Sequence, residues 1–134
     1  MAIYVTSDAH GHVRALDEAL SKISLTSDDT LYVLGDMIDR GPDPVGVIKL
    51  VRSLPNARVL KGNHEQIMLD AIIGQDPLDA ETWDINGGWT TSEQLNDMEF
   101  EAYEELGRWM ATLPLCAVAE TEERPYLLVH AGIE

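Results

Sequence analysis

The chain has 134 residues, of which 24 are acidic and 9 basic, so its formal net charge at neutral pH is −15. This length suffices for one hydrophobic core, and residues 1–134 are predicted to form a single domain. The negative charge argues against a nucleic-acid partner, because the nucleic-acid phosphates would be repelled.

The sequence predicts a cytoplasmic protein that does not bind membranes. It has no apolar run as long as a membrane span, and the first predicted strand begins at residue 3, which leaves no room for a signal peptide. The single cysteine, Cys116, excludes a disulfide within the chain and fits a reducing compartment. Because Cys116 lies in the apolar run 115–118, its side chain is expected to pack in the interior.

Three apolar, strand-like runs in the first half of the chain are each followed by a polar motif and then by a helical pattern. The runs are residues 3–5, 31–34 and 58–60. The motifs are S-D-A-H-G at 7–11, G-D-M-I-D-R-G at 35–41 and G-N-H-E at 62–65. A fourth strand-like run, 127–129, is followed by His130, Ala131 and Gly132. This order predicts an α/β fold with polar side chains at the carboxyl ends of the strands.

The elements between and after these motifs are mainly helical. Apolar residues at helical spacing predict helices over 12–23, 44–54 and from 63 to about 74. Residues 75–113 form an acidic helical segment that is broken at 86–89, and 115–119 and 125–130 are predicted to pair as a hairpin. His12 is expected to face solvent in the first turn of the first helix and to have no role in the site.

The break at Asn86-Gly87-Gly88-Trp89 leaves two interpretations open. Trp89 either packs on the core beside a glycine turn or forms a wall next to a substrate site, which would make this segment decide substrate choice. The next helix is expected to begin near residue 91 or 92. Trp83 and Trp109 fall at helical positions among apolar residues and are expected to line the core or a groove.

The motifs place oxygen and nitrogen ligands where ligands bind in open α/β sheets, at the carboxyl edge. Each motif taken alone has a structural explanation, since Asp commonly caps helices and both Asp and Asn are frequent in turns. Four strand ends that all carry such residues favour a shared metal site. Aspartate, asparagine and histidine together suit Mn, Fe or Zn.

These motifs, in this order, resemble the metal-dependent phosphoprotein phosphatase family of serine/threonine phosphatases, within the calcineurin-like metallophosphoesterases. The pattern is D-x-H-G, G-D-x-x-D-R-G, G-N-H-E and then H-A-G, and it is most similar to that of the compact bacterial and phage members. The resemblance implies an αββα sandwich, here truncated, with a helical insertion between the third strand and the C-terminal hairpin.

The resemblance also implies a role for each motif residue. It implies two divalent cations, Mn²⁺ first and Fe or Zn as alternatives, that activate a bridging hydroxide. The implied metal ligands, with Asp36 as the bridge, are Asp8, His10, Asp36, Asn63 and His130. His64 would be the general acid and Asp39 would orient its imidazole, while Arg40 and Lys61 would bind the phosphate.

Two departures from the family pattern stand out. Lys61 occupies a position where many relatives carry arginine, so looser phosphate binding is expected. The chain also ends at Glu134, whereas relatives continue past H-A-G with another arginine and another histidine ligand. The domain is therefore expected to be incomplete, with water, another chain or Glu134 in place of the missing ligand. The chain is then either a fragment of a longer protein or a natural short form that pairs with itself. In both cases truncation would expose a sheet edge that invites self-association.

Three functions remain open from the sequence. The first is hydrolysis of phosphoserine and phosphothreonine in proteins or of small phosphoesters. The second is hydrolysis of bis(5'-nucleosyl) tetraphosphates by a related enzyme class, which tends to carry Asp where this chain has Glu65, so that Glu65 favours the phosphatase. The third is a truncated remnant that binds metal but lacks turnover.

Overall fold

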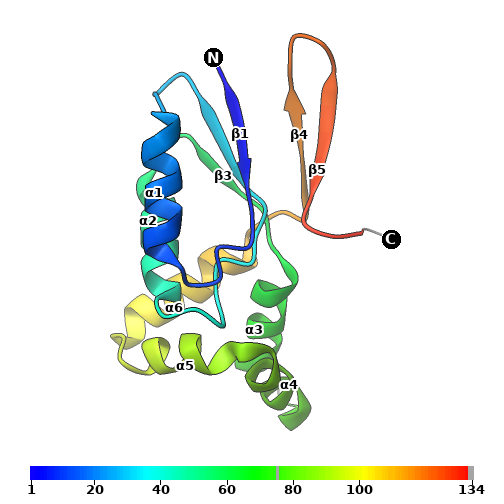
Figure 1. The fold of residues 1–134 in the computed structure, drawn as a ribbon. Helices are drawn as coiled ribbons and strands as arrows, with labels where there is room; N and C mark the ends of the chain where they lie inside the picture. The colour runs from blue at the N-terminus through cyan, green and yellow to red at the C-terminus, as the bar shows by residue number, and fades with distance from the viewer. Residues whose placement is uncertain (75, 133–134) are drawn as a thin grey trace.

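Three parallel strands form the centre of the computed structural model, which describes residues 1–74 and 76–132. They are β1 (Ile3–Thr6), β2 (Thr30–Val33) and β3 (Ala57–Val59), and they lie in the order β1-β2-β3 (Figure 1). The central strand β2 is buried from Leu31 to Val33, as expected for a strand covered on both faces. Gln75, the start of the predicted acidic segment, and Glu134, the suggested extra ligand, lie outside the described residues.

Helices α1 (Val13–Ile23) and α2 (Pro44–Ser53) make the two crossovers that a parallel sheet requires. Both cover the same face of the sheet (Figure 1). Helix α2 begins where the Asp43 carboxylate accepts a 2.9 Å hydrogen bond from the backbone N–H of Gly46, with Pro44 in the first turn. This cap fixes the end of the loop that carries the second motif.

The hairpin of β4 (Cys116–Glu120) and β5 (Pro125–Val129) lies on the side of the sheet away from α1 and α2 (Figure 1). The Tyr32 hydroxyl donates to the carbonyl of Val118 at 3.5 Å and links the two layers. Helix, parallel sheet and hairpin therefore form successive layers, and the predicted α/β metallophosphoesterase architecture is confirmed.

The remaining helices gather beyond the carboxyl edge of the sheet (Figure 1). They are α3 (Asn63–Ile73), α4 (Pro77–Trp83), α5 (Trp89–Asn96) and α6 (Phe100–Ala111), with a short turn, η1 (Asp84–Gly88), between α4 and α5. The helical insertion predicted between the third strand and the hairpin is thus present. The break predicted at 86–89 is a kink at Gly87, whose φ of 92° is non-helical, and α5 begins at Trp89, two residues before the expected start.

The structure corrects the prediction for Cys116, whose side chain is exposed. Cys116 and Val118 lie on the outward face of β4, since alternate residues of a strand point to opposite faces. Trp89 is 54% exposed, whereas Trp83 is buried and Trp109 packs against the core as expected. An apolar run alone did not show which face of this strand is covered.

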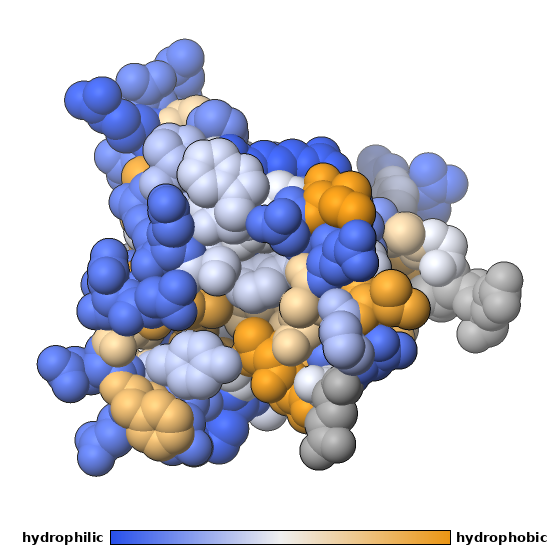
Figure 2. All heavy atoms as spheres, turned by 90° about the horizontal axis from the view of Figure 1, so that it is seen from below, coloured by the Kyte–Doolittle hydropathy of each residue, from blue (hydrophilic) through white to orange (hydrophobic). Residues whose placement is uncertain are grey.

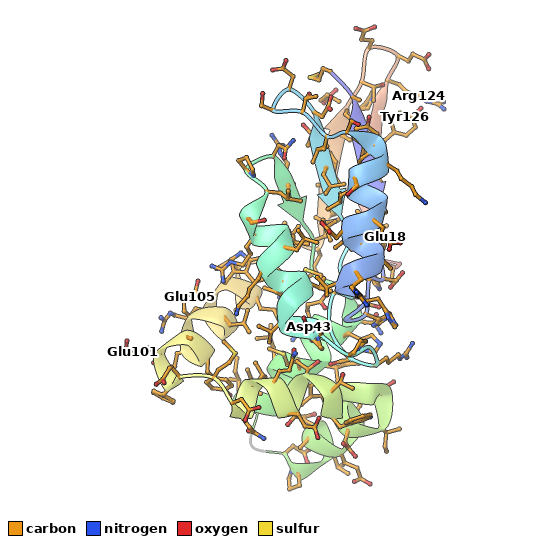
Figure 3. All side chains as sticks on the ribbon, turned by 60° about the vertical axis from the view of Figure 1, so that its left-hand side comes forward. Glu18, Asp43, Glu101, Glu105, Arg124 and Tyr126 are labelled. Atoms are coloured by element: carbon orange, nitrogen blue, oxygen red, sulfur yellow. The ribbon has the colours of Figure 1, made fainter. Side chains whose placement is uncertain are left out.

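The acidic side chains lie mainly at the surface. Glu101 and Glu105 project from the outer side of α6 (Figure 3), where Glu105 pairs with Arg52 of α2. The face seen from below the sheet is largely hydrophilic, with separate hydrophobic patches (Figure 2). Among the described residues, no helix combines the length and apolar character that crossing a membrane requires.

Candidate metal centre and acid–base pair

The loops that follow β1 and β2 adopt an unusual backbone conformation at the predicted site residues. Left-handed φ angles are uncommon outside glycine and cluster at functional sites. Six described non-glycine residues have positive φ, and one of them, Ser24, simply ends α1. The other five are all predicted site residues: Asp8, His10, Asp36, Asp39 and Arg40.

Backbone contacts between the loops hold these conformations. The N–H of His10 donates to the carbonyl of Asp36 at 2.9 Å and joins the first loop to the second. Gly35, with φ of 96°, allows the second loop to touch the third, because a Cβ there would lie 2.2 Å from the nitrogen of Gly62. Three separate sequence motifs are thereby locked into one surface.

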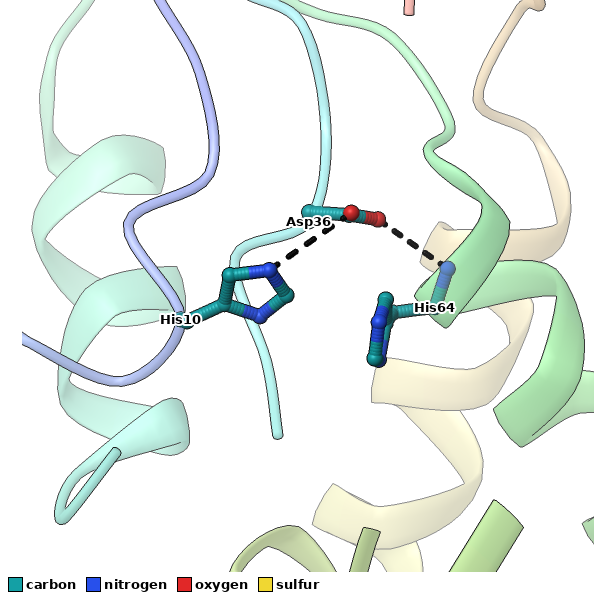
Figure 4. A group of neighbouring side chains, drawn as sticks. All are labelled: His10, Asp36 and His64. Atoms are coloured by element: carbon teal, nitrogen blue, oxygen red, sulfur yellow. Dashed lines mark hydrogen bonds and ion pairs between the residues drawn. The ribbon is translucent and has the colours of Figure 1, made fainter. Parts of the chain in front are cut away.

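The Asp36 carboxylate lies at the centre of the resulting cluster. Its Oδ2 is 3.1 Å from Nε2 of His130 and 3.6 Å from Nε2 of His10, and His10 Nε2 is 3.8 Å from the Asp8 carboxylate. Figure 4 shows Asp36 between His10 and His64. Two groups of converging ligand atoms share Asp36: one with His10 and His64, the other with Asp8 and His130. A shared carboxylate is the arrangement that a pair of neighbouring cations requires.

His10 and His130, the two histidines whose Nε2 atoms face Asp36, have the ring orientation that metal binding requires. His10 Nδ1 is 2.7 Å from the carbonyl of Ile38, and His130 Nδ1 is 2.7 Å from the carbonyl of Leu34. Because a carbonyl oxygen only accepts, each Nδ1 carries the proton and each Nε2 presents a lone pair to Asp36 in the neutral ring. Metal-binding histidines in proteins are typically held this way.

Asn63 completes this arrangement. Its amide lies 3.0 Å from His130 Nε2, and the two amide orientations present either the oxygen or the NH₂ group to His130 and Asp36. In one orientation the NH₂ group donates to these acceptors, and in the other the amide oxygen would be available as a ligand to a bound cation. With two imidazoles, two carboxylates and one amide, the donor set fits Mn²⁺, Fe or Zn.

Electrostatics at Asp36 also favour a cation. Burial raises the pKa of the Asp36 carboxyl, while the backbone N–H of His64, which donates to Oδ1 at 3.0 Å, opposes this rise. A carboxylate that is costly to ionise in a buried site gains most from a nearby positive charge. Asp36 is therefore suited to hold metal rather than to stay unpaired.

His64 lies beside the cluster and is held by a different contact. Its Nδ1 donates to Oδ2 of Asp39 at 2.7 Å, and both side chains are buried. The His64 ring lies edge-on to that of His10, with 4.7 Å between the ring centres. A buried carboxylate–imidazole pair fixes which ring nitrogen carries a proton and where the other nitrogen points.

Glu65 has a structural role that the sequence did not indicate. It is fully buried, and its carboxylate accepts hydrogen bonds from the backbone N–H groups of Asp36 at 2.6 Å, Gly62 at 2.9 Å and Met37 at 3.2 Å. Burial raises the pKa of Glu65 to about 7, although these donors oppose the rise. The only sequence signal for this role was a glutamate three residues after Gly62, the spacing at which a glutamate side chain caps the start of a helix.

The two predicted phosphate-binding side chains, Arg40 and Lys61, make their described hydrogen bonds outside the carboxylate cluster. Arg40 is exposed, and its Nε donates to the carbonyl of Asn86 at 3.4 Å. Lys61 Nζ donates to Gln66 at 3.3 Å and lines a hollow of about 280 Å³ with Asn63 and other residues. The described contacts join neither cation to Asp36, so both flank the cluster instead of entering it.

Comparison with known proteins agrees with this geometry. The family model described as calcineurin-like phosphoesterase matches residues 1–134. Among curated proteins, the chain is 32% identical to a symmetrical bis(5'-nucleosyl)-tetraphosphatase of Erwinia tasmaniensis and 33% identical to that of Proteus mirabilis, with 99% of the chain aligned in each case. The chain spans 45% of the length of both relatives.

Solved structures show the same fold. A metallophosphoesterase from Sphaerobacter thermophilus is 27% identical, with a TM-score of 0.60 over 87% of this chain and 42% of that one. A serine/threonine phosphatase from Saccharomyces cerevisiae is 18% identical, with a TM-score of 0.62 over 87% of this chain and 37% of that one, and it supports the fold alone. With a cluster of metal-type ligands at the carboxyl edge of this fold and a family match over its whole length, the chain belongs to the calcineurin-like phosphoesterases, a family of metal-dependent hydrolases.

Proposed function

We propose that this site hydrolyses phosphomonoesters with two divalent cations, Mn²⁺ first among them, and that His64 is its general acid. The observation that carries the proposal is the buried Asp39–His64 pair directly beside Asp36. An alkoxide leaving group requires a proton, and a histidine held by a carboxylate supplies one. Serine and threonine phosphoesters have such leaving groups, so phosphorylated proteins are the proposed substrates.

Each residue of the chain has a defined part in this proposal. Asp36 would hold both cations, and bound cations would polarise the phosphoryl oxygens and lower the pKa of water. The remaining ligands are proposed to be Asp8, His10, Asn63 and His130. His64 would donate the proton on Nε2 to the leaving oxygen, while Asp39 accepts from Nδ1 and keeps the ring in place. Arg40 and Lys61 would neutralise phosphate charge from the rim.

A second substrate class has support from the relatives. The two named curated proteins are tetraphosphatases and match almost the whole chain. Glu65 does not decide against this class, because its contacts are with backbone N–H groups of the site loops and a residue of this kind positions Asp36 whatever the substrate. A nucleoside diphosphate leaves as a weakly basic anion, so this reaction would depend less on His64.

The test is metal stoichiometry followed by turnover. After loading with Mn²⁺ and removal of excess metal, the protein should retain two ions and release phosphate from a phosphoserine peptide. Replacement His64→Asn should keep the metal but slow the peptide reaction by about 10²-fold or more. Faster cleavage of diadenosine tetraphosphate, unaffected by His64→Asn, would favour the second class. Bound metal without turnover of either substrate would favour a binding remnant and reject the enzyme.

The compartment and the surface partners also belong to this proposal. A single exposed cysteine fits a reducing environment, and we place the protein in the bacterial cytoplasm. The strongly negative charge favours substrates whose flanking residues are basic.

A further inference from the structure

The helical insertion holds the Asp39 carboxylate from the side opposite His64. Oδ1 of Asp39 accepts a hydrogen bond from the Thr91 hydroxyl at 2.7 Å and another from the Trp83 indole N–H at 3.0 Å. The backbone N–H of Asp39 in turn donates to the same Thr91 hydroxyl at 3.0 Å. Asp39 and Thr91 have no exposed surface, and Trp83 is buried as well.

We propose that Trp83 and Thr91 are positioning residues that fix the Asp39 carboxylate and, through it, the imidazole of His64. The inference rests on the proposed role of His64 as general acid. A carboxylate rotates easily about its last torsion angle, which has broad, shallow minima. Here Oδ1 accepts from Trp83 and Thr91 and Oδ2 accepts from His64, so rotation of the group would break at least one buried hydrogen bond.

The turn that connects Trp83 to Thr91 packs closely against its neighbours. Gly88 leaves no room for a side chain, because a Cβ there would lie 2.3 Å from the Trp83 ring. The carbonyl of Gly87, at φ of 92°, accepts a hydrogen bond from the backbone N–H of Arg40 at 3.0 Å. The kinked turn η1 thus packs its two glycines against Trp83 and Arg40, and Trp83 and Thr91 reach the same carboxylate from either side of it.

The competing explanation is that Trp83 and Thr91 bond to Asp39 only because buried polar groups need hydrogen-bond partners. A buried indole N–H needs an acceptor, and a buried threonine needs partners, whether or not a reaction takes place nearby. That explanation predicts that removal of either donor weakens folding and lowers turnover of all substrates equally. Positioning of an acid predicts a loss that grows with the basicity of the leaving group.

The kinetic test compares Trp83→Phe and Thr91→Val in the Mn²⁺-loaded protein, with 4-nitrophenyl phosphate and phenyl phosphate as substrates. We expect kcat for phenyl phosphate to fall about tenfold, because phenolate needs the proton, and kcat for 4-nitrophenyl phosphate to fall less than about twofold. Mn²⁺ stoichiometry should not change. Trp109→Phe and Thr112→Val, which replace the same residue types away from the site, should alter neither rate. Equal losses on both substrates would overturn the proposal.

A second measurement does not depend on turnover. In the metal-free protein at alkaline pH, ¹⁵N spectra of His64 should show the tautomer with the proton on Nδ1, and the Trp83→Phe, Thr91→Val double variant should populate the other tautomer as well. An unchanged tautomer would overturn the positioning role. If the wild-type protein lacks turnover while the tautomer responds, the proposed enzyme function fails and the positioning of His64 by the insertion stands.

Discussion

Asp36 is the residue on which the candidate metal centre depends most, because both groups of converging ligand atoms include it. We predict that Asp36→Asn abolishes retention of both Mn²⁺ ions, since an amide supplies one neutral oxygen where a carboxylate supplies two charged ones. Metal content per chain, measured after gel filtration, tests this. The exposed Asp97→Asn serves as the matched control and should retain the wild-type amount. Retention of even one tightly bound ion by Asp36→Asn would show that the two sites do not share this carboxylate.

Glu65 should make the stability of the metal-free protein depend on pH. Its pKa rises from 4.5 to about 7 on folding, so the folded state binds the extra proton between these values. The contribution of Glu65 to stability is therefore complete below pH 4.5 and is lost as the pH rises through about 7. The loss is at most about 3 kcal/mol in the free energy of unfolding.

Urea unfolding of the metal-free protein between about pH 5 and about pH 8 measures this dependence. Glu65→Gln cannot ionise and should flatten the curve over this range, while the exposed Glu93→Gln on α5 should leave it unchanged. An equally steep curve for Glu65→Gln would assign the pH dependence to other groups.

The motifs predicted which polar side chains meet, but not what holds them. Asp8 and His10 follow the half-buried strand β1 and Asp36 follows the buried strand β2 of the same parallel sheet, so their meeting follows from chain topology alone. The contacts of Glu65 with Asp36 and of Thr91 with Asp39 span 29 and 52 residues and depend on how α3 and α5 pack. Local sequence patterns do not identify such partners, because threonine and glutamate are also common in exposed helices.

At the scale of elements, periodicity located the strands β1 to β5 and the helices α1 to α3 to within a few residues. The break predicted at residues 86–89 is present as a kink at Gly87, whose φ of 92° is non-helical. The acidic segment did not reveal where α5 ends and α6 begins, nor that α5 starts as early as Trp89. That early start depends on contacts of Gly88 with Trp83 and of Gly87 with Arg40, which only the folded chain brings together.

Replacement of two glycines by alanine should change the stability of the protein in opposite directions. Gly107 lies inside α6, where an added Cβ would meet only Ile72 Cδ1 at 3.8 Å, so Gly107→Ala should raise the free energy of unfolding by about 0.5–1 kcal/mol. Gly62 lies against the second loop, where a Cβ would be 2.5 Å from the nitrogen of Asp36, so Gly62→Ala should cost about 2 kcal/mol.

Urea midpoints of the two variants test the pair under identical conditions. Gly62→Ala should also lose Mn²⁺, because the backbone that would yield carries the proposed bridging ligand. A stable Gly62→Ala protein with full metal content would mean that the loops separate without cost, contrary to their tight packing.

At the scale of the whole molecule, an apolar surface and a strong net charge oppose each other. Val118 and Leu127 are directly paired across the hairpin, so both side chains lie on the same face, and they are 52% and 61% exposed. Burial of such a face favours association with a second copy. The net charge of −15 repels that copy over about 10 Å at moderate salt.

This balance predicts self-association that increases with salt. Sedimentation at low ionic strength should show mainly monomer, and added NaCl should raise the average mass as it screens the repulsion between copies. Leu127→Lys places a charge in the centre of the apolar face and should keep the protein monomeric at all salt concentrations. Leu78→Lys, at an equally exposed leucine of α4, should associate like the wild type, because α4 lies at the opposite end of the molecule (Figure 1). If both lysine variants behaved alike, the hairpin face would not be the contact, and charge alone would govern association.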